Sequence, residues 1–168
     1  RDRENQKDLA AAKWLSGENG IAKVEVQRED SSLETIRLNV IHRDHVAGGK
    51  TVYEVVNQFG ADKKSEMDRN RIFDVTLLIN GLPMIHIELK NRKHPFMDSF
   101  RQIQKYLKEG HFTSIYSTLQ MFVVSNASET RYIAAAQFEK LNAKFLSKWV
   151  TAKNQAVNDY LQFASDVL

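Results

Sequence analysis

The first half of the chain contains runs in which apolar and polar residues alternate, a pattern typical of strands with one buried face. The alternation is clear over residues 34–42 and 51–56 and only partial over 21–27. Before these runs, residues 1–15 carry apolar side chains at helical spacing, which predicts an amphipathic helix. The stretch 61–70 is almost wholly polar, so we expect an exposed loop there.

Two further strand-like runs, 71–79 and 82–90, flank the dipeptide Asn80-Gly81, which is a strong hairpin signal because both residues tolerate a positive φ. Every second residue in each run is apolar. Residues directly opposite each other on the two strands share a face. The two apolar rows therefore lie on the same face only if the two residue numbers of each such pair add up to an even value. A two-residue turn would pair Ile79 with Leu82, which is an odd sum. We therefore predict a three-residue loop with the glycine in the left-handed conformation, forming a bulge.

This register decides where the polar residues of the hairpin lie. It places Asp74 on the same face as His86, Glu88 and Lys90, directly opposite His86 or Glu88. Two neighbouring carboxylates repel each other unless a cation lies between them, and hard oxygen donors suit Mg²⁺. Lys90 adds a positive charge, so these groups are sufficient for phosphodiester hydrolysis. The simpler interpretation makes Glu88 and Lys90 surface charges on a polar outer face, and for His86 we prefer that interpretation.

A helix is predicted over residues 99–109, with Asp98 as its N-cap and Gly110 as its end. Helical spacing puts Gln102 and Tyr106 together on a polar strip. The expected buried stripe beside this strip consists of Phe100, Ile103 and Leu107.

The remaining pattern predicts a short buried strand over 121–124 and two helices over 132–149 and 152–167. The order of helix, antiparallel strands, helix, strand and helices indicates a mixed α/β fold. A chain of 168 residues fits one domain, so we expect a single domain over 1–168.

The composition excludes several classes of protein. The chain has no cysteine, which excludes disulfides, thiol catalysis and cysteine-ligated metal sites. No apolar run approaches the ~20 residues needed to span a bilayer, and the first residues are not a signal peptide. We therefore expect a soluble, cytoplasmic protein without a membrane partner. The net charge of +3 favours polyanionic partners only mildly. Because the chain starts at Arg1 inside a helical pattern, we expect it to be a piece of a larger protein.

Residues 71–90, RIFDVTLLINGLPMIHIELK, resemble the PD-(D/E)xK nuclease motif, with Phe73 in place of the proline. More narrowly, they resemble the N-terminal endonuclease domain of the R (HsdR) subunit of type I restriction-modification enzymes. Gln102 and Tyr106 are similar to the Gln-x-x-x-Tyr motif that this family and the RecB-like nucleases carry on the following helix. The resemblance continues over residues 122–132.

The resemblance implies a restriction-endonuclease-like core, in which helices flank a central mixed sheet of four or five strands. It also implies Mg²⁺-dependent cleavage of double-stranded DNA, with Mn²⁺ as a substitute ion. Asp74, Glu88 and the backbone carbonyl of Leu89 would be the metal ligands. Whether one metal or two would bind is left open.

The same resemblance assigns roles to three further residues. Lys90 would orient or deprotonate the attacking water and stabilise charge on phosphorus. Gln102 and Tyr106 would position Lys90 or the scissile phosphate. Separately from the resemblance, the basic runs 62–71 and 91–94 either contact the DNA backbone or are simply solvated charges.

The resemblance further implies partners outside these residues: an ATP-dependent motor in the same subunit, and separate modification and specificity subunits. No Walker A pattern occurs in the chain, so ATP is expected only in the motor, and the isolated domain is expected to cleave weakly or not at all. Two alternatives are a RecB-type repair or recombination nuclease and a non-catalytic DNA-binding or assembly module. Glu4 and Asp8 are candidates for an additional acidic ligand, but no motif selects either one.

Overall fold

The computed structural model describes residues 15, 21–27, 32, 34–47, 49–61 and 70–168. The helix predicted over 1–15 lies outside the described residues apart from Leu15. Most of the polar stretch 61–70 and the candidates Glu4 and Asp8 also lie outside them. No helix among the described residues is long and apolar enough to cross a membrane.

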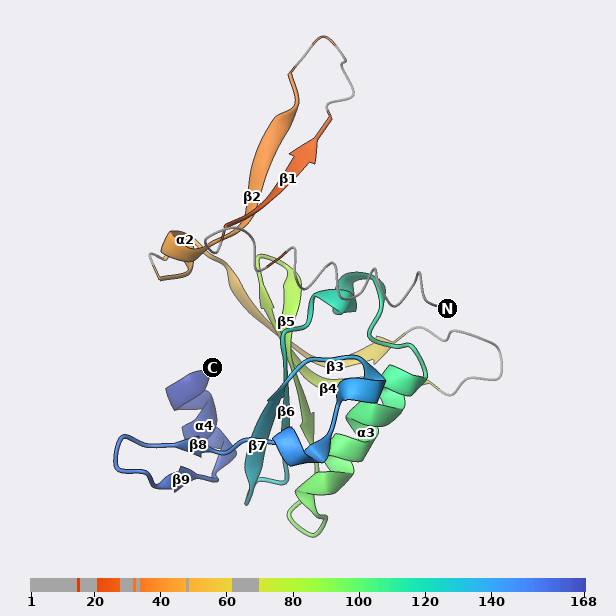
Figure 1. Cartoon of the computed structure of the whole chain (residues 1–168), viewed down its shortest axis with the longest axis vertical. Coiled ribbons are helices and arrows are strands. Elements are labelled where there is room, and N and C mark those ends of the chain that lie inside the picture. Colours follow the sequence, from red (N-terminus) through yellow and green to blue (C-terminus); the bar gives the residue numbers. More distant parts are fainter. Residues whose placement is uncertain (1–14, 16–20, 28–31, 33, 48, 62–69) are drawn as a thin grey trace.

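A five-stranded mixed sheet forms the centre of the molecule (Figure 1). Its strands, in spatial order, are β3 (Tyr53–Ala61), β4 (Arg71–Ile79), β5 (Leu82–Leu89), β6 (Met121–Ser125) and β7 (Thr130–Ala134). The pair β5 and β6 is parallel, whereas the other three pairs are antiparallel. A parallel pair requires a crossover connection, which is supplied here by α3 (Phe96–Lys108) and the short 3₁₀ helix η1 (Ser114–Thr118). The mixed α/β class predicted from the sequence is confirmed.

A separate antiparallel hairpin precedes the sheet and extends away from it (Figure 1). It consists of β1 (Ile21–Val26) and β2 (Ile36–His42) and is followed by the single-turn helix α2 (Arg43–Ala47). Asn80, in the turn of the central sheet, joins the two parts. Its side-chain amide donates to the Val40 carbonyl at 2.8 Å, and its side-chain oxygen accepts from the Val52 amide at 3.0 Å.

The turn between β4 and β5 differs from the predicted three-residue loop. Ile79 pairs with Leu82 across a two-residue turn in which both central residues have positive φ, so the loop prediction is wrong. The register shifts one step later, because Leu78 pairs with Pro83 but Leu77 pairs with Ile85. From that bulge onward paired residue numbers sum to 162, the even value that we predicted. Proline lacks an N–H for the ladder, and within a central strand it is accommodated at bulges.

Helix α3 covers one face of the sheet. It begins at Phe96 after Pro95, so Asp98 lies in its first turn and is not the predicted N-cap. Gly110 ends it with φ of 72°. The predicted Phe100 and Ile103 are buried, but Tyr106 occupies the core where Leu107 was expected, and Leu107 is only partly buried. The core under α3 also contains Phe73, Phe112, Leu119, Phe122, Val124, Ile133 and Leu141.

The apolar row of the hairpin faces the opposite side of the sheet, except for Phe73, which packs under α3. Val75 and Ile87 from this row line an apolar cavity of about 370 Å³ together with Phe163. Phe163 belongs to the C-terminal helix α4 (Tyr160–Val167), which lies on this side with the short pair β8 (Trp149–Val150) and β9 (Ala156–Val157) (Figure 1). The central strands are therefore covered on both faces, and the predicted polar outer face of the hairpin does not exist.

The C-terminal third differs most from the sequence prediction. In place of a helix over 132–149, the chain forms β7, which pairs with β6, and then two 3₁₀ turns. These turns are η2 (Phe138–Lys140) and η3 (Ala143–Phe145). The predicted helix over 152–167 is shortened to α4. Ala134, Ala135 and Ala136 favour a helix locally, but the exposed edge of β6 offers backbone partners to residues 130–134, and this non-local pairing outweighs propensity.

Candidate active site

The three charged residues predicted to act together meet where β4 and β5 run side by side. Glu88 Oε1 lies 3.4 Å from Lys90 Nζ, which forms an ion pair. Asp74 approaches the same point from β4, where its Oδ2 accepts the backbone N–H of Leu89 at 2.8 Å. The β4–β5 pairing extends as far as Val75 and Ile87, and just beyond this pair Asp74 is close enough to Glu88 to act on it through its charge and a side-chain hydrogen bond.

Burial separates these residues into an inner and an outer group. The side chain of Glu88 has 0% exposure, whereas that of Lys90 retains 27% and Asp74 is also partly exposed. Glu88 is therefore not the surface charge of the simpler interpretation. A molecule arriving from solvent would meet Asp74 and Lys90 first.

Burial and neighbouring charge make Glu88 an unusual carboxyl group. Burial is the largest cause that raises its pKa, to about 8, and the negative charge of Asp74 raises it further. The ammonium of Lys90 acts in the opposite direction but does not offset these effects. The protonated form of the metal-free Glu88 is therefore favoured at neutral pH, and a bound cation would favour the ionised form.

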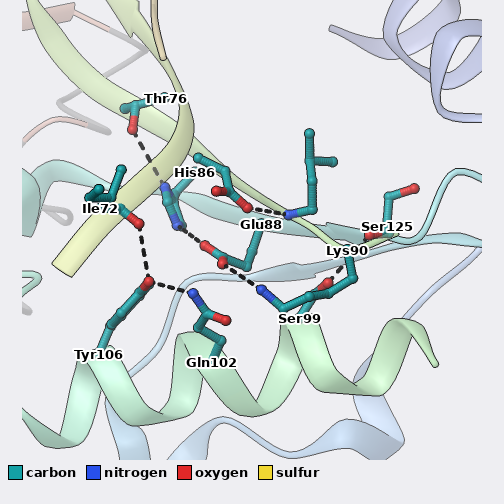
Figure 2. Close-up of polar contacts among 11 residues, drawn as sticks. Ile72, Thr76, His86, Glu88, Lys90, Ser99, Gln102, Tyr106 and Ser125 are labelled. Carbon is teal, nitrogen blue, oxygen red and sulfur yellow. Dashed lines mark hydrogen bonds and ion pairs between the residues drawn. The ribbon is translucent and has the colours of Figure 1, made fainter. Parts of the chain in front are cut away.

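His86 lies between Thr76 and Glu88 (Figure 2) and is fully buried, which corrects the prediction of a polar outer-face residue. Its Nε2 is 3.3 Å from Glu88 Oε2, and its Nδ1 is 3.4 Å from the hydroxyl of Thr76. Aromatic rings surround the imidazole, with the centroids of Phe73 and Phe112 at 5.1 and 5.2 Å. This burial lowers the pKa of His86 to about 4, so the imidazole is neutral at physiological pH.

Gln102 and Tyr106 project from α3 toward the strands (Figure 2). The Gln102 amide donates to the Tyr106 hydroxyl at 2.5 Å, and this hydroxyl donates to the Ile72 carbonyl in β4 at 3.1 Å. An ion pair between Arg71 and Glu109 at 2.6 Å fastens the same end of the helix to β4. The structure thus brings the predicted Gln102–Tyr106 pair to the strand that carries Asp74.

A polar cavity of about 310 Å³ opens beside this pair, lined by residues of α3 and by Arg71 at the start of β4. Arg71, Arg101 and Lys105 contribute cations to its lining, and Asp98 contributes an acid that binds Arg101 at 2.7 Å. The apolar cavity on the α4 side of the sheet has no comparable set of charges.

The donor set at Asp74 and Glu88 fits a hard divalent cation. The ranges that the structure describes hold no cluster of three or more histidine, cysteine or acidic side chains that could bind a metal. Two carboxylates nevertheless suffice for Mg²⁺, which keeps several waters and is usually bound through one or two carboxylates plus substrate phosphate. Burial and the charge of Asp74 raise the pKa of Glu88 more than Lys90 lowers it, so a cation beside Glu88 would favour its ionised form.

Sequence reasoning missed the contact of His86 with Glu88 and the contact of Thr76 with His86. The necessary signal was present, because Thr76 and His86 also sum to 162 and therefore face each other across the strands. The reason for the omission is that the hairpin was read as having one covered face. In the structure α3 covers the polar row as well.

Comparison with known protein families gives a match over nearly the whole chain. The family model described as the type I restriction enzyme R protein N terminus matches residues 7–161. This range includes every residue of the candidate active site.

Individual relatives agree with the family match. The chain is 33% identical over 140 residues to the type I restriction enzyme EcoprrI endonuclease subunit of Escherichia coli. It is 31% identical over 146 residues to the SauCOLORF180P endonuclease subunit of Staphylococcus aureus (strain COL). These matches cover 82% and 87% of the chain, but only 42% and 15% of the relatives. The chain therefore spans less than half the length of these proteins.

Proposed function

The chain belongs to the family of type I restriction enzyme R protein N-terminal regions, and from this premise we propose that it is a Mg²⁺-dependent endonuclease domain with a PD-(D/E)xK core. Its substrate would be double-stranded DNA and its reaction the hydrolysis of a phosphodiester bond. The observation that carries the proposal is the meeting of Asp74, Glu88 and Lys90 at one point of the β4–β5 hairpin. Such a site needs two oxygen ligands and an adjacent cation.

Asp74 and Glu88 would hold the metal, with the Leu89 carbonyl as a backbone ligand. Bound Mg²⁺ supplies Lewis-acid activation of the phosphate. Lys90 Nζ, held 3.4 Å from Glu88 and partly exposed, would donate to the attacking water or to the phosphate oxygens. Negative charge builds up on the phosphate oxygens in the transition state, so an ammonium fixed beside them lowers the barrier.

The polar cavity beside α3 supports DNA as the polymer bound. Arg101 and Lys105 line it next to Gln102, where they could contact phosphates flanking the cleaved bond. Such contacts hold the duplex without reading its sequence. The choice of a DNA site would therefore belong to another subunit.

The proposal extends to the rest of the enzyme. The chain would be one domain of a longer R subunit that also carries an ATP-dependent motor, and this subunit would assemble with modification and specificity subunits. The names of the relatives, which are restriction endonuclease subunits, favour this assignment over a RecB-type repair nuclease.

An Asp74→Asn variant of the full-length subunit tests the proposal in the assembled enzyme, with supercoiled plasmid, ATP and Mg²⁺. The substitution removes one charge but leaves an oxygen for the Leu89 amide, so the fold should persist. We expect cleavage to fall by more than ~100-fold, since changes in residues that only support metal ligands already cost about 10–100-fold.

Asp166→Asn is the matched control, because Asp166 is an exposed acid on α4. It should cleave like the wild type. Undiminished cleavage by Asp74→Asn would contradict the assignment of the site, whatever the partners.

A further inference from the structure

The buried pair of His86 and Thr76 touches the proposed metal site without offering it a ligand of its own. Both side chains lie on the inner side of Glu88, away from the partly exposed Asp74 and Lys90. Buried polar side chains in a protein core are retained only when they are hydrogen bonded. Thr76 and His86 contact each other, and His86 contacts the Glu88 carboxylate; the Val75 backbone also bonds His86, and Tyr116 also bonds Thr76.

We infer that His86 is a positioning residue, whose Nε2–H donates to Glu88 Oε2 and fixes the carboxylate for metal binding, while the Thr76 hydroxyl donates to Nδ1 and selects that tautomer. The inference rests on the proposed function, because it assigns a support to a proposed metal ligand. Carboxylates that ligate a metal are usually hydrogen bonded to groups outside the first ligand shell.

The direction of each hydrogen bond follows from the state of Glu88. A metal-bound carboxylate is ionised and can only accept, so the facing Nε2 must carry the hydrogen. A neutral imidazole has a single N–H, and its Nδ1 is then an acceptor. The Thr76 hydroxyl lies 3.4 Å from Nδ1 and is able to donate to it.

The surroundings of His86 hold the ring in one place. Phe73 and Phe112 pack against it, and Phe122 lies with its centroid at 6.4 Å. These rings keep water away, so the imidazole cannot exchange its partners for solvent. Each oxygen of Glu88 therefore has its own partner: Oε2 faces His86 and Oε1 faces Lys90.

These two separate contacts give the Glu88 carboxylate a defined orientation. A carboxylate without a fixed donor on its inner oxygen could rotate about its terminal torsion, which is broad for glutamate. A fixed inner donor keeps the carboxylate plane constant with respect to Asp74. The entropic cost of arranging the ligands is then met during folding and not during metal binding.

A calorimetric titration of the full chain with Mn²⁺ tests the inference in matched pairs of variants. His86→Phe removes the donor but keeps a ring, and we expect its Kd for Mn²⁺ to rise by about 10–100-fold. His86→Gln retains an amide donor and should restore most of the affinity. Thr76→Val should weaken binding, whereas Thr76→Ser, which keeps the hydroxyl, should bind like the wild type.

A buried control separates positioning from general destabilisation. Val157→Ala, in the apolar cluster under α4, should lower the melting temperature without changing the Kd. Nuclear magnetic resonance of the ¹⁵N-labelled imidazole in the Mg²⁺-loaded wild type gives a second readout, and we expect the hydrogen on Nε2.

The possible results distinguish the inference from the proposed function. If the wild type binds Mn²⁺, Asp74→Asn does not, and folded His86→Phe and Thr76→Val bind as the wild type does, only the positioning role is overturned. Hydrogen on Nδ1 in the loaded protein overturns it as well, and this result decides the matter even if His86→Phe fails to fold. If the wild type does not bind Mn²⁺, the proposed function fails and the positioning role fails with it.

Discussion

Replacing Glu88 by glutamine should change how the stability of the metal-free protein depends on pH. The folded protein raises the pKa of this carboxyl from an ordinary value of 4.5 to about 8, chiefly by burial and then by the charge of Asp74. Between these values the folded state holds a proton that the unfolded state has lost. The free energy of unfolding therefore falls as the pH rises through that window. A glutamine of the same shape has no proton to lose.

His86 partly hides this effect at lower pH. Burial lowers its pKa from 6.5 to about 4, so the unfolded state takes up a proton between these values, and stability falls as the pH drops. From pH 4.5 to 6.5 the two slopes oppose each other. Above pH 6.5 only the Glu88 slope remains, and at about 1.4 kcal/mol per pH unit the wild type should lose about 2 kcal/mol by pH 8.

Urea unfolding followed by circular dichroism, with a chelator present, measures both profiles. The wild type should lose stability from pH 6.5 to 8, while Glu88→Gln stays level there and loses stability only below pH 6.5. Glu139→Gln, at an exposed acid in η2, should follow the wild type. Parallel profiles for wild type and Glu88→Gln between pH 6.5 and 8 would refute the buried, proton-holding carboxyl.

Three further substitutions test the framework around the site by the same urea method. Gly81→Ala forces a side chain into the turn at φ of 77° and should cost about 1–2 kcal/mol; no loss would mean that the turn differs. Phe100→Ala empties a fully buried position under α3 and should cost about 3–5 kcal/mol, so a cost below 1 kcal/mol would contradict the core described here. Tyr106→Phe removes the hydroxyl shared by Gln102 and Ile72 and should cost about 1 kcal/mol. Calorimetry should show its Mn²⁺ affinity unchanged, and a large loss of affinity would indicate that the hydroxyl supports the metal site.

The hairpin shows what the pattern of residues could predict. Alternation required an even register, and the strands have one from Leu77 and Ile85 to Val75 and Ile87 although the predicted loop was wrong. The error arose because the turn and the register were treated as one feature. Pro83 was the missing signal, since a proline inside a central strand indicates a bulge that changes the register after the turn.

Two other errors have a different physical origin. Burial of His86 depends on α3 covering the polar face, and no local pattern in the hairpin reports that coverage. The strand β7 forms because residues 130–134 find an edge of the sheet, a non-local interaction that overrides local helix preference. Helix α3 itself was predicted nearly to its boundaries, because its apolar spacing and its glycine stop are local features.

Met84, which has no partner in the pairing of β4 with β5, has a consequence for how this protein can vary in length. Deleting it would leave the turn intact but move every later residue of β5 to the other side of the sheet, which would take Glu88 and Lys90 away from Asp74. Insertions or deletions of an odd number of residues between the turn and Glu88 should thus abolish the site while preserving a hairpin. Natural or engineered versions of this chain that keep the site should change that spacing only in steps of two, or recover the parity with a second irregularity.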